Sequence, residues 1–128
     1  MDSKAKKILV VDDEVHILHV VSLKLRNAGY AVITAQDGRE ALELAQVERP
    51  DLIITDYQMP YLSGLELCQK LKHIPITSHI PAIMLTARGF SLDSSAMEIA
   101  GIVKCINKPF GPREVLQIVE EILSSVFA

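Results

Sequence analysis

The feature that most constrains the fold is a regular alternation of two hydrophobic patterns along the chain. Short apolar runs rich in β-branched residues, such as KILVV and LIITD, are separated by segments whose apolar residues recur three and four positions apart. The first pattern is typical of buried strands and the second of amphipathic helices. We therefore expect strands at 7–11, 30–35, 52–56, 82–86 and 102–107.

Local signals indicate where the intervening helices begin and end. Asp12 or Asp13 can cap the first helix, and Gly29 suits the left-handed position that follows a helix. Asp37 opens the second helix, and Pro112 suits the first position of the last one. The expected helices carry apolar stripes over 15–25, 41–45, 65–71, roughly 92–100, and 115–123.

Strands and helices in strict alternation build a parallel sheet with helices on both faces, because the crossovers between parallel strands are right-handed. The chain has 128 residues, of which 49% are hydrophobic, enough for one domain with a buried core and too few for two ordinary ones. The sequence therefore predicts one α/β domain, a doubly wound parallel sheet of five strands with five helices.

Polar residues stand where four of the five strands end. Asp12 and Asp13 follow the first strand, Asp56 ends the third, Thr86 ends the fourth and Lys108 follows the fifth. In a parallel sheet these ends meet at one edge, where open α/β sheets bind their ligands. Three carboxylates brought together there would repel one another unless a divalent cation lay between them.

Each of these residue types has a use in phosphoryl transfer. A carboxylate such as Asp56 can act as the nucleophile, and two further acids can hold Mg²⁺. A hydroxyl and an ammonium, here Thr86 and Lys108, can bind the oxygens of the transferred group. Taken singly, the acids could be ordinary helix caps, the threonine a strand-end residue and the lysine a solvated one. Their combination at four strand ends predicts a site.

The sequence resembles a receiver domain of a two-component response regulator. The matching stretches are VVDDE at 10–14, TDYQMP at 55–60, Gly64, TA at 86–87 and KPF at 108–110. They occur in the family's order, and the resemblance covers about 7–124 of the chain. It implies a single receiver domain over 1–128 with a flavodoxin-like sheet in strand order 2-1-3-4-5.

The resemblance also implies how the phosphoryl group is handled. Asp56 would accept it from the phosphohistidine of a histidine kinase. Thr86 and Lys108 would contact its oxygens. The Lys108–Pro109 peptide is expected to be cis, as it is in the family.

A metal site follows from the same resemblance, with Mg²⁺ as the ion. Asp13 and Asp56 would ligate Mg²⁺ through their carboxylates. Gln58 would ligate it through its backbone carbonyl, and Asp12 would act through a water molecule.

Three features depart from the family or vary within it. Many receivers carry Tyr or Phe three residues before the strand-five lysine, and that ring moves inward on phosphorylation; here the residue is Cys105. Many transcriptional receivers carry an acidic pair just before that position, where this chain has Val103 and Lys104. This difference argues against the dimer that those regulators commonly form. Gln58 and Arg88 occupy positions that tune phosphoryl lifetime in the family.

Two other functions fit parts of the pattern. A metal-dependent phosphohydrolase would also use Asp56 as a transient nucleophile, but such enzymes usually place another acid two residues later, where this chain has Gln58. An unphosphorylated receiver-like scaffold would more often have lost an acid or the lysine. The favoured interpretation is a signalling module that catalyses only its own phosphorylation and dephosphorylation.

Composition limits the expected partners. A net charge of -3 without long runs of one sign argues against direct binding to nucleic acid or to a membrane surface. No stretch approaches the ~18 apolar residues of a membrane span, and Cys68 and Cys105 suit reduced thiols, so we expect a cytoplasmic location. The expected partners are a sensor histidine kinase or phosphotransfer protein and a downstream effector. That effector is either a separate protein or part of a longer chain.

Overall fold

The computed structural model describes residues 5–87 and 92–126, and within them it contains one open parallel sheet. The strands lie in the order β2-β1-β3-β4-β5, and every neighbouring pair is parallel. This arrangement confirms the predicted doubly wound fold and strand order. The strands are β1 (Lys7–Val11), β2 (Ala31–Ala35), β3 (Leu52–Asp56), β4 (Ala82–Thr86) and β5 (Ile102–Asn107).

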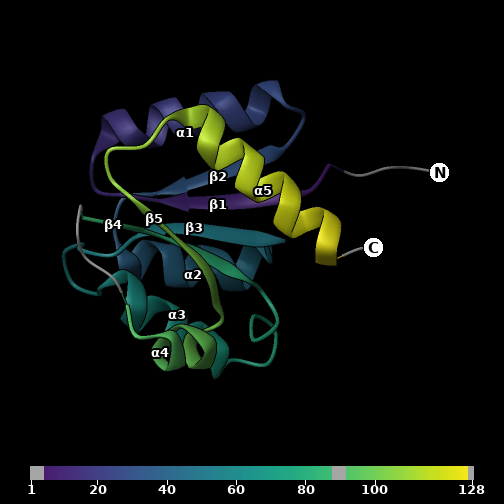
Figure 1. Cartoon of the computed structure of the whole chain (residues 1–128). Coiled ribbons are helices and arrows are strands. Elements are labelled where there is room, and N and C mark those ends of the chain that lie inside the picture. Colours follow the sequence, from purple (N-terminus) through teal and green to yellow (C-terminus); the bar gives the residue numbers. More distant parts are fainter. Residues whose placement is uncertain (1–4, 88–91, 127–128) are drawn as a thin grey trace.

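Helices cover both faces of the sheet. Figure 1 shows α1 and α5 on one face and α2, α3 and α4 on the other. No helix within the described ranges is long and apolar enough to cross a membrane. The helices are α1 (Val15–Asn27), α2 (Gly38–Glu48), α3 (Gly64–Lys72), α4 (Ser94–Ala100) and α5 (Pro112–Val126).

The sheet separates two hydrophobic clusters. Ile8 and Val10 of β1 pack with residues of α1 and α5, whereas Leu9 and Val11 pack with residues of α2 and α3. This division follows from strand geometry, since successive side chains point to opposite faces. Strands β3 and β4 are buried along their whole length, which explains why their sequences are nearly continuous apolar runs.

Most helix ends agree with the local signals. The Asp37 side chain accepts a hydrogen bond from the Glu40 amide at the start of α2. Gly29, just past the end of α1, has a φ of 102°, the left-handed conformation expected of it. Pro112 is the first residue of α5. These signals are reliable because each satisfies backbone groups or a dihedral angle at the helix end itself.

Two helix starts differ from the prediction. The residue that precedes α1 is Glu14, not Asp12 or Asp13, and its side chain makes no capping bond. Asp12 lies instead at the end of β1, where its Oδ1 accepts a hydrogen bond from the Glu14 amide at 2.9 Å. Helix α4 begins at Ser94 rather than 92, because the Asp93 side chain caps it by accepting from the amide of Ala96.

Candidate functional site

The three predicted acids meet at the carboxyl edge of the sheet. One carboxylate oxygen from each of Asp12, Asp13 and Asp56 lies within 4.8 Å of the others. Asp12 is completely buried and Asp56 is 8% exposed, while Asp13 is exposed. Asp56 ends β3, and the other two follow the neighbouring strand β1, so the parallel pairing of these strands brings them together. Asp13 and Asp56 line an open cavity of about 440 Å³, whose walls also include Glu14, Tyr57, Gln58, Ala87 and Lys108.

Lys108 brings a positive charge into this cluster. Its Nζ lies 3.2 Å from Asp12 Oδ2, 3.1 Å from Glu14 Oε1 and 3.2 Å from Asp56 Oδ1. Burial opposes its charge, but the hydrogen bond to Glu14 and the charges of Asp12 and Asp56 outweigh burial and raise the pKa of the ammonium. The Lys108–Pro109 peptide is cis, as predicted. The lysine is therefore held charged at the centre of the acids.

The pKa values of the two buried carboxyl groups are raised in this arrangement. Burial, and next the charge of Asp12, raise the pKa of Asp56 to about 6 despite the nearby lysine. Burial also raises the pKa of Asp12, against the hydrogen bond from Glu14 and the charge of Lys108. A cation placed among these groups stabilises their ionised forms. The site thus favours binding of a further positive charge.

Thr86 presents a hydroxyl that lacks a partner. It ends β4 and is completely buried, and its Oγ1 has no hydrogen-bond partner within the described parts of the chain. The amide of Lys108 donates to the Thr86 carbonyl at 2.7 Å, which fixes the ends of β4 and β5 side by side. A buried hydroxyl left unpaired is costly, so such groups call for a functional explanation. Here the hydroxyl can donate to an oxygen bound beside Asp56.

Gln58 lies on the loop between β3 and α3, exposed at the wall of the cavity. The loop is held close to the strand end by Gly64, whose amide donates to the Tyr57 carbonyl at 2.8 Å. A Cβ on Gly64 would overlap the Asp56 carbonyl oxygen and would lie 2.8 Å from the Met84 sulfur. Glycine is required here by the close approach of two backbones, a requirement that could not be derived from the sequence.

The structure adds one site contact that was not predicted from the sequence. Glu14 was noted only as part of the VVDDE stretch, yet its carboxylate pairs with Lys108. Its place directly after the two acids was the available signal. Arg88, at a position that tunes phosphoryl lifetime in the family, lies outside the described residues.

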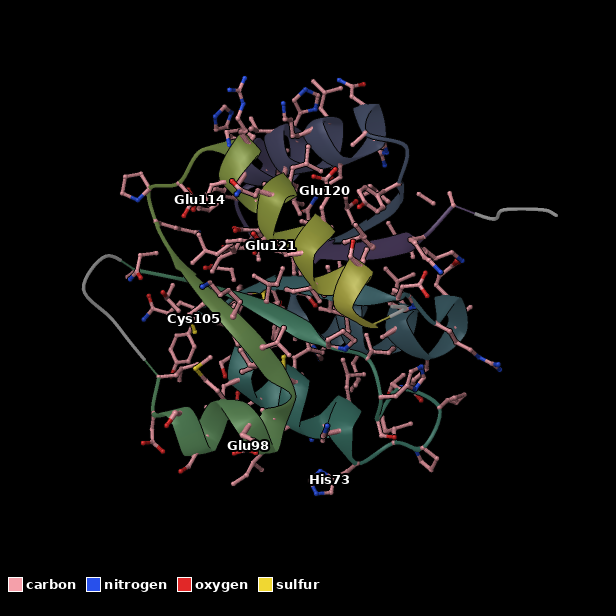
Figure 2. All side chains as sticks on the ribbon, turned by 45° about the vertical axis from the view of Figure 1, so that its right-hand side comes forward. His73, Glu98, Cys105, Glu114, Glu120 and Glu121 are labelled. Carbon is pink, nitrogen blue, oxygen red and sulfur yellow. The ribbon has the colours of Figure 1, made fainter. Side chains whose placement is uncertain are left out.

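Cys105 and Cys68 occupy different environments. Cys68 is buried on α3 within the hydrophobic core, and burial raises the pKa of its thiol to about 12. Cys105 is half-buried on β5, with its Sγ 3.8 Å from the sulfur of Met97 on α4. Figure 2 shows Cys105 on β5 above α4, which carries Glu98, whereas Glu114, Glu120 and Glu121 lie on α5.

The comparison with protein families decides the classification. The family described as the response regulator receiver domain matches residues 8–120. The chain belongs to this family. Receivers of two-component response regulators are phosphorylated on an aspartate by histidine kinases, and the chain shares their fold.

Curated relatives of this receiver are longer proteins. The alkaline phosphatase synthesis transcriptional regulatory protein PhoP of Bacillus subtilis is 44% identical over 92% of this chain, which is 48% of PhoP. The phosphate regulon transcriptional regulatory protein PhoB of Pseudomonas aeruginosa is 37% identical over 92% of this chain and 52% of its own length. The chain thus spans about half the length of these relatives.

Two solved receivers match the chain over nearly their full length. The chemotaxis response regulator CheY4 of Vibrio cholerae has a TM-score of 0.85 at 35% identity, covering 93% of this chain and 99% of CheY4. The receiver domain of the sensor histidine kinase PA1611 from Pseudomonas aeruginosa has a TM-score of 0.81 at 29% identity, covering 92% and 97%. That second structure has a magnesium ion coordinated in its active site cleft.

Proposed function

We propose that Asp56 is the phosphoacceptor of this receiver. The observation that supports it is the meeting of a nearly buried Asp56 carboxylate with the Lys108 ammonium and the unpaired Thr86 hydroxyl at the ends of three strands. A carboxylate is a competent nucleophile for phosphoryl transfer when its position is fixed. The ammonium and hydroxyl then bind oxygens of the transferred group, where charge must be stabilised.

The reaction moves one phosphoryl group without net redox change. An Asp56 carboxylate oxygen forms a bond to phosphorus as the bond from phosphorus to the donor's histidine nitrogen breaks. The bonding electrons leave with the histidine nitrogen of the donor, which can take up a proton from water. The chain thereby catalyses its own phosphorylation, and hydrolysis of the acyl phosphate by water returns it to the starting state.

We further propose that the acid cluster holds Mg²⁺. The residues fit this ion, because Asp12, Asp13 and Asp56 offer oxygen ligands within 4.8 Å of one another. Asp13 and Asp56 would bind through carboxylates, Gln58 through its backbone carbonyl and Asp12 through water. When bound, Mg²⁺ neutralises charge on the acids and on the phosphoryl oxygens. Its presence in the PA1611 receiver supports the assignment.

An apolar groove beside the site suits the phosphoryl donor. It encloses about 500 Å³ and is lined by His16, Ile17, Val20, Pro109 and Phe110, among others. It shares Glu14, Ala87 and Lys108 with the acid cavity, so it adjoins the place to which a partner would deliver a phosphoryl group. We propose that a helix of a histidine kinase or phosphotransfer protein, bearing the phosphohistidine, packs here. Val20→Ala should slow phosphotransfer from the kinase more than phosphorylation by acetyl phosphate.

The remaining assignments concern the chain as a whole. We propose that residues 7–124 form the core of one receiver domain spanning 1–128. Its output is a changed surface that regulates an effector, either a separate protein or a part of a longer chain. Direct contact with nucleic acid or a membrane is not part of this function. Free thiols at Cys68 and Cys105 suit a cytoplasmic location.

Intact-mass measurement tests the phosphoacceptor. Wild type incubated with acetyl phosphate and Mg²⁺ should gain one phosphoryl adduct, and Asp56→Asn should gain none. Asp51→Asn is the matched control, because Asp51 lies at the opposite end of β3, where it accepts from the Lys7 amide. An undiminished adduct on Asp56→Asn would place the phosphoryl group elsewhere and overturn the proposal.

A further inference from the structure

We propose that the contact between Arg39 of α2 and Tyr61 of the β3–α3 loop positions the loop that carries Gln58, and so sets the affinity of the site for Mg²⁺. This inference rests on the proposed function, since it concerns the same metal site. It makes Arg39 and Tyr61 positioning residues that touch neither metal nor phosphoryl group.

The loop contains a strained turn. Tyr61 has a φ of 71°, in the left-handed region that non-glycine residues seldom adopt. The Leu62 amide donates to the Pro60 carbonyl at 2.8 Å, which closes a three-residue γ-turn around Tyr61. A γ-turn with positive φ at its centre is rare and strained, and it persists only when surrounding contacts hold it.

The first turn of α2 supplies those contacts. The Arg39 guanidinium carbon lies 3.9 Å from the centroid of the Tyr61 ring, a cation–π geometry. Tyr61 is 71% exposed, so little else restrains its ring. The preceding residue, Gly38, lies so near the loop that a Cβ on it would be 2.5 Å from Leu62 Cβ and 2.6 Å from the Leu62 carbonyl oxygen. Helix α2 therefore abuts the loop at the point where the backbone is strained.

The two ends of the loop are fixed by other interactions. At its start the Tyr57 amide donates to Leu85 of β4 at 2.9 Å, and its carbonyl accepts from Gly64. At its end Ser63 and Glu66 form a reciprocal capping box at the start of α3. Between these ends lies the segment 58–62, which contains both Gln58 and the strained turn. Within it Met59 and Leu62 pack against the hydrophobic core, so the exposed residues of the segment are the ones free to shift.

Loss of the Arg39–Tyr61 contact lets this segment relax, and the Gln58 carbonyl leaves the position in which it can bind a cation. The three aspartates stay in place in this mechanism, because Asp56 ends β3 and Asp12 and Asp13 directly follow β1, outside the segment 58–62. An exposed cation–π contact corresponds to about a two- to fivefold change in an equilibrium constant. We therefore expect Arg39→Ala and Tyr61→Ala each to raise the dissociation constant for Mg²⁺ by about two- to fivefold.

The direction in which Arg39→Ala changes the affinity for Mg²⁺ distinguishes a positioning role from a purely electrostatic one. Removing a positive charge near an acidic site strengthens cation binding by long-range electrostatics. The proposed mechanism weakens it instead. Tyr61→Phe keeps the ring and should bind Mg²⁺ as the wild type does, which serves as the conservative rescue. Arg39→Ala and Tyr61→Ala combined should weaken binding no more than either alone, because both remove one contact.

The experiment is calorimetric titration of the metal-free chain with Mg²⁺ for the wild type and these four variants, with thermal unfolding of each in chelator. Weaker binding in both single variants, no further loss in the double variant and unchanged metal-free melting temperatures support the proposal. Unaltered affinities, tighter binding by Arg39→Ala, additive losses, or melting temperatures that fall without a change in affinity overturn it. A wild type that binds no Mg²⁺ overturns the metal site and this inference together, whereas normal wild-type binding with unaltered variants overturns the inference alone.

Discussion

Lys108 contacts three carboxylates at once, and these contacts offset part of the repulsion among the acids. Its ammonium lies 3.1 to 3.2 Å from oxygens of Asp12, Glu14 and Asp56. Asp13 makes no such contact with Lys108 within the described structure, and it is the exposed member of the acid cluster. The two buried acids are therefore partly compensated, and Asp13 contributes repulsion without an ion pair to this lysine.

The raised pKa of Asp56, about 6, makes stability depend on pH. Because this value exceeds the ordinary carboxyl value of about 4, the folded chain binds the proton more readily than the unfolded chain. Its contribution therefore favours folding at low pH and is lost as pH rises through about 6. In chelator, Asp56→Asn should gain stability relative to wild type between pH 5 and pH 7, on the order of 1–2 kcal/mol.

Urea unfolding of both proteins at the two pH values, at constant ionic strength, measures this difference. Comparing variant with wild type cancels the titration of the four histidines. A variant whose advantage shrinks between pH 5 and pH 7 would show that Asp56 is not protonated more readily in the folded chain.

The site residues that could be predicted from the sequence are those marked by a local sequence signal. Asp12, Asp13, Asp56, Thr86 and Lys108 belong to this group because each ends or follows a recognisable strand, and a parallel sheet gathers such ends. Contacts between segments that carry no shared local signal could not be predicted. The Arg39–Tyr61 stack joins residues from α2 and the β3–α3 loop, and nothing in either stretch marks the other as its partner.

At the scale of elements, the approach of α3 to the end of β3 shapes the site. Gly64 begins α3 directly against the Asp56 carbonyl. The sequence indicated a helix near this position, but it did not indicate why the residue is glycine. A side chain on residue 64 would clash with Asp56 and Met84, which are not its neighbours in the sequence. Most helix bounds were predicted where a cap or a left-handed glycine marks them. The start of α4 was placed two residues early although Asp93 caps it, and the start of α1 was missed because Asp12 is engaged at the strand end.

Replacing Gly64 by alanine should disturb both stability and the site. The new Cβ would overlap backbone of β3, so the loop or the strand must shift, at a cost of about 1–3 kcal/mol. Phosphorylation by acetyl phosphate should slow as well. Gly111→Ala is the matched control, since a Cβ there has nothing within 4 Å. Equal unfolding free energies for the two variants would contradict the predicted clash.

Strand β5 should respond weakly to phosphorylation. Cys105 occupies the position where many receivers have an aromatic ring, and a small side chain cannot fill and vacate a pocket as a ring does. We expect NMR shift changes on phosphorylation to concentrate near Thr86 and the loop after it. Shift changes of equal size along the whole of β5 would contradict this prediction and would indicate that another side chain moves in place of the aromatic ring.

For the whole molecule, the alternation of strands and helices was enough to predict an α/β fold with both faces of the sheet covered. The order of the strands could not be derived from this alternation. Right-handed crossovers do not determine which edge each new strand joins, so the order 2-1-3-4-5 came from the family resemblance. The structure confirms it. This order makes β1 and β3 parallel neighbours, which brings the three acids together at their carboxyl ends. The stability of the whole molecule therefore depends on the charge held there.

Neutralising Asp13 should therefore raise the melting temperature of the metal-free chain. Two like charges ~5 Å apart at an effective dielectric of ~20 repel by about 3 kcal/mol before screening. Mg²⁺ should stabilise the wild type by binding only the folded state, and stabilise Asp13→Asn less. Thermal unfolding of both proteins, with and without millimolar Mg²⁺ at constant ionic strength, checks this. A metal-free variant that melts below wild type, with no effect of Mg²⁺ on either, would be inconsistent with the site.

The most direct test of the metal-dependent phosphoacceptor site is the rate at which acetyl phosphate phosphorylates the chain as a function of Mg²⁺ concentration. We predict no adduct in chelator, a rate that saturates with Mg²⁺, and a shift of that curve to higher concentration in Asp13→Asn. Intact mass at timed intervals gives the rate for both proteins. An adduct that forms equally fast in chelator and in saturating Mg²⁺ would contradict the claim that these carboxylates form a metal-dependent phosphoacceptor site.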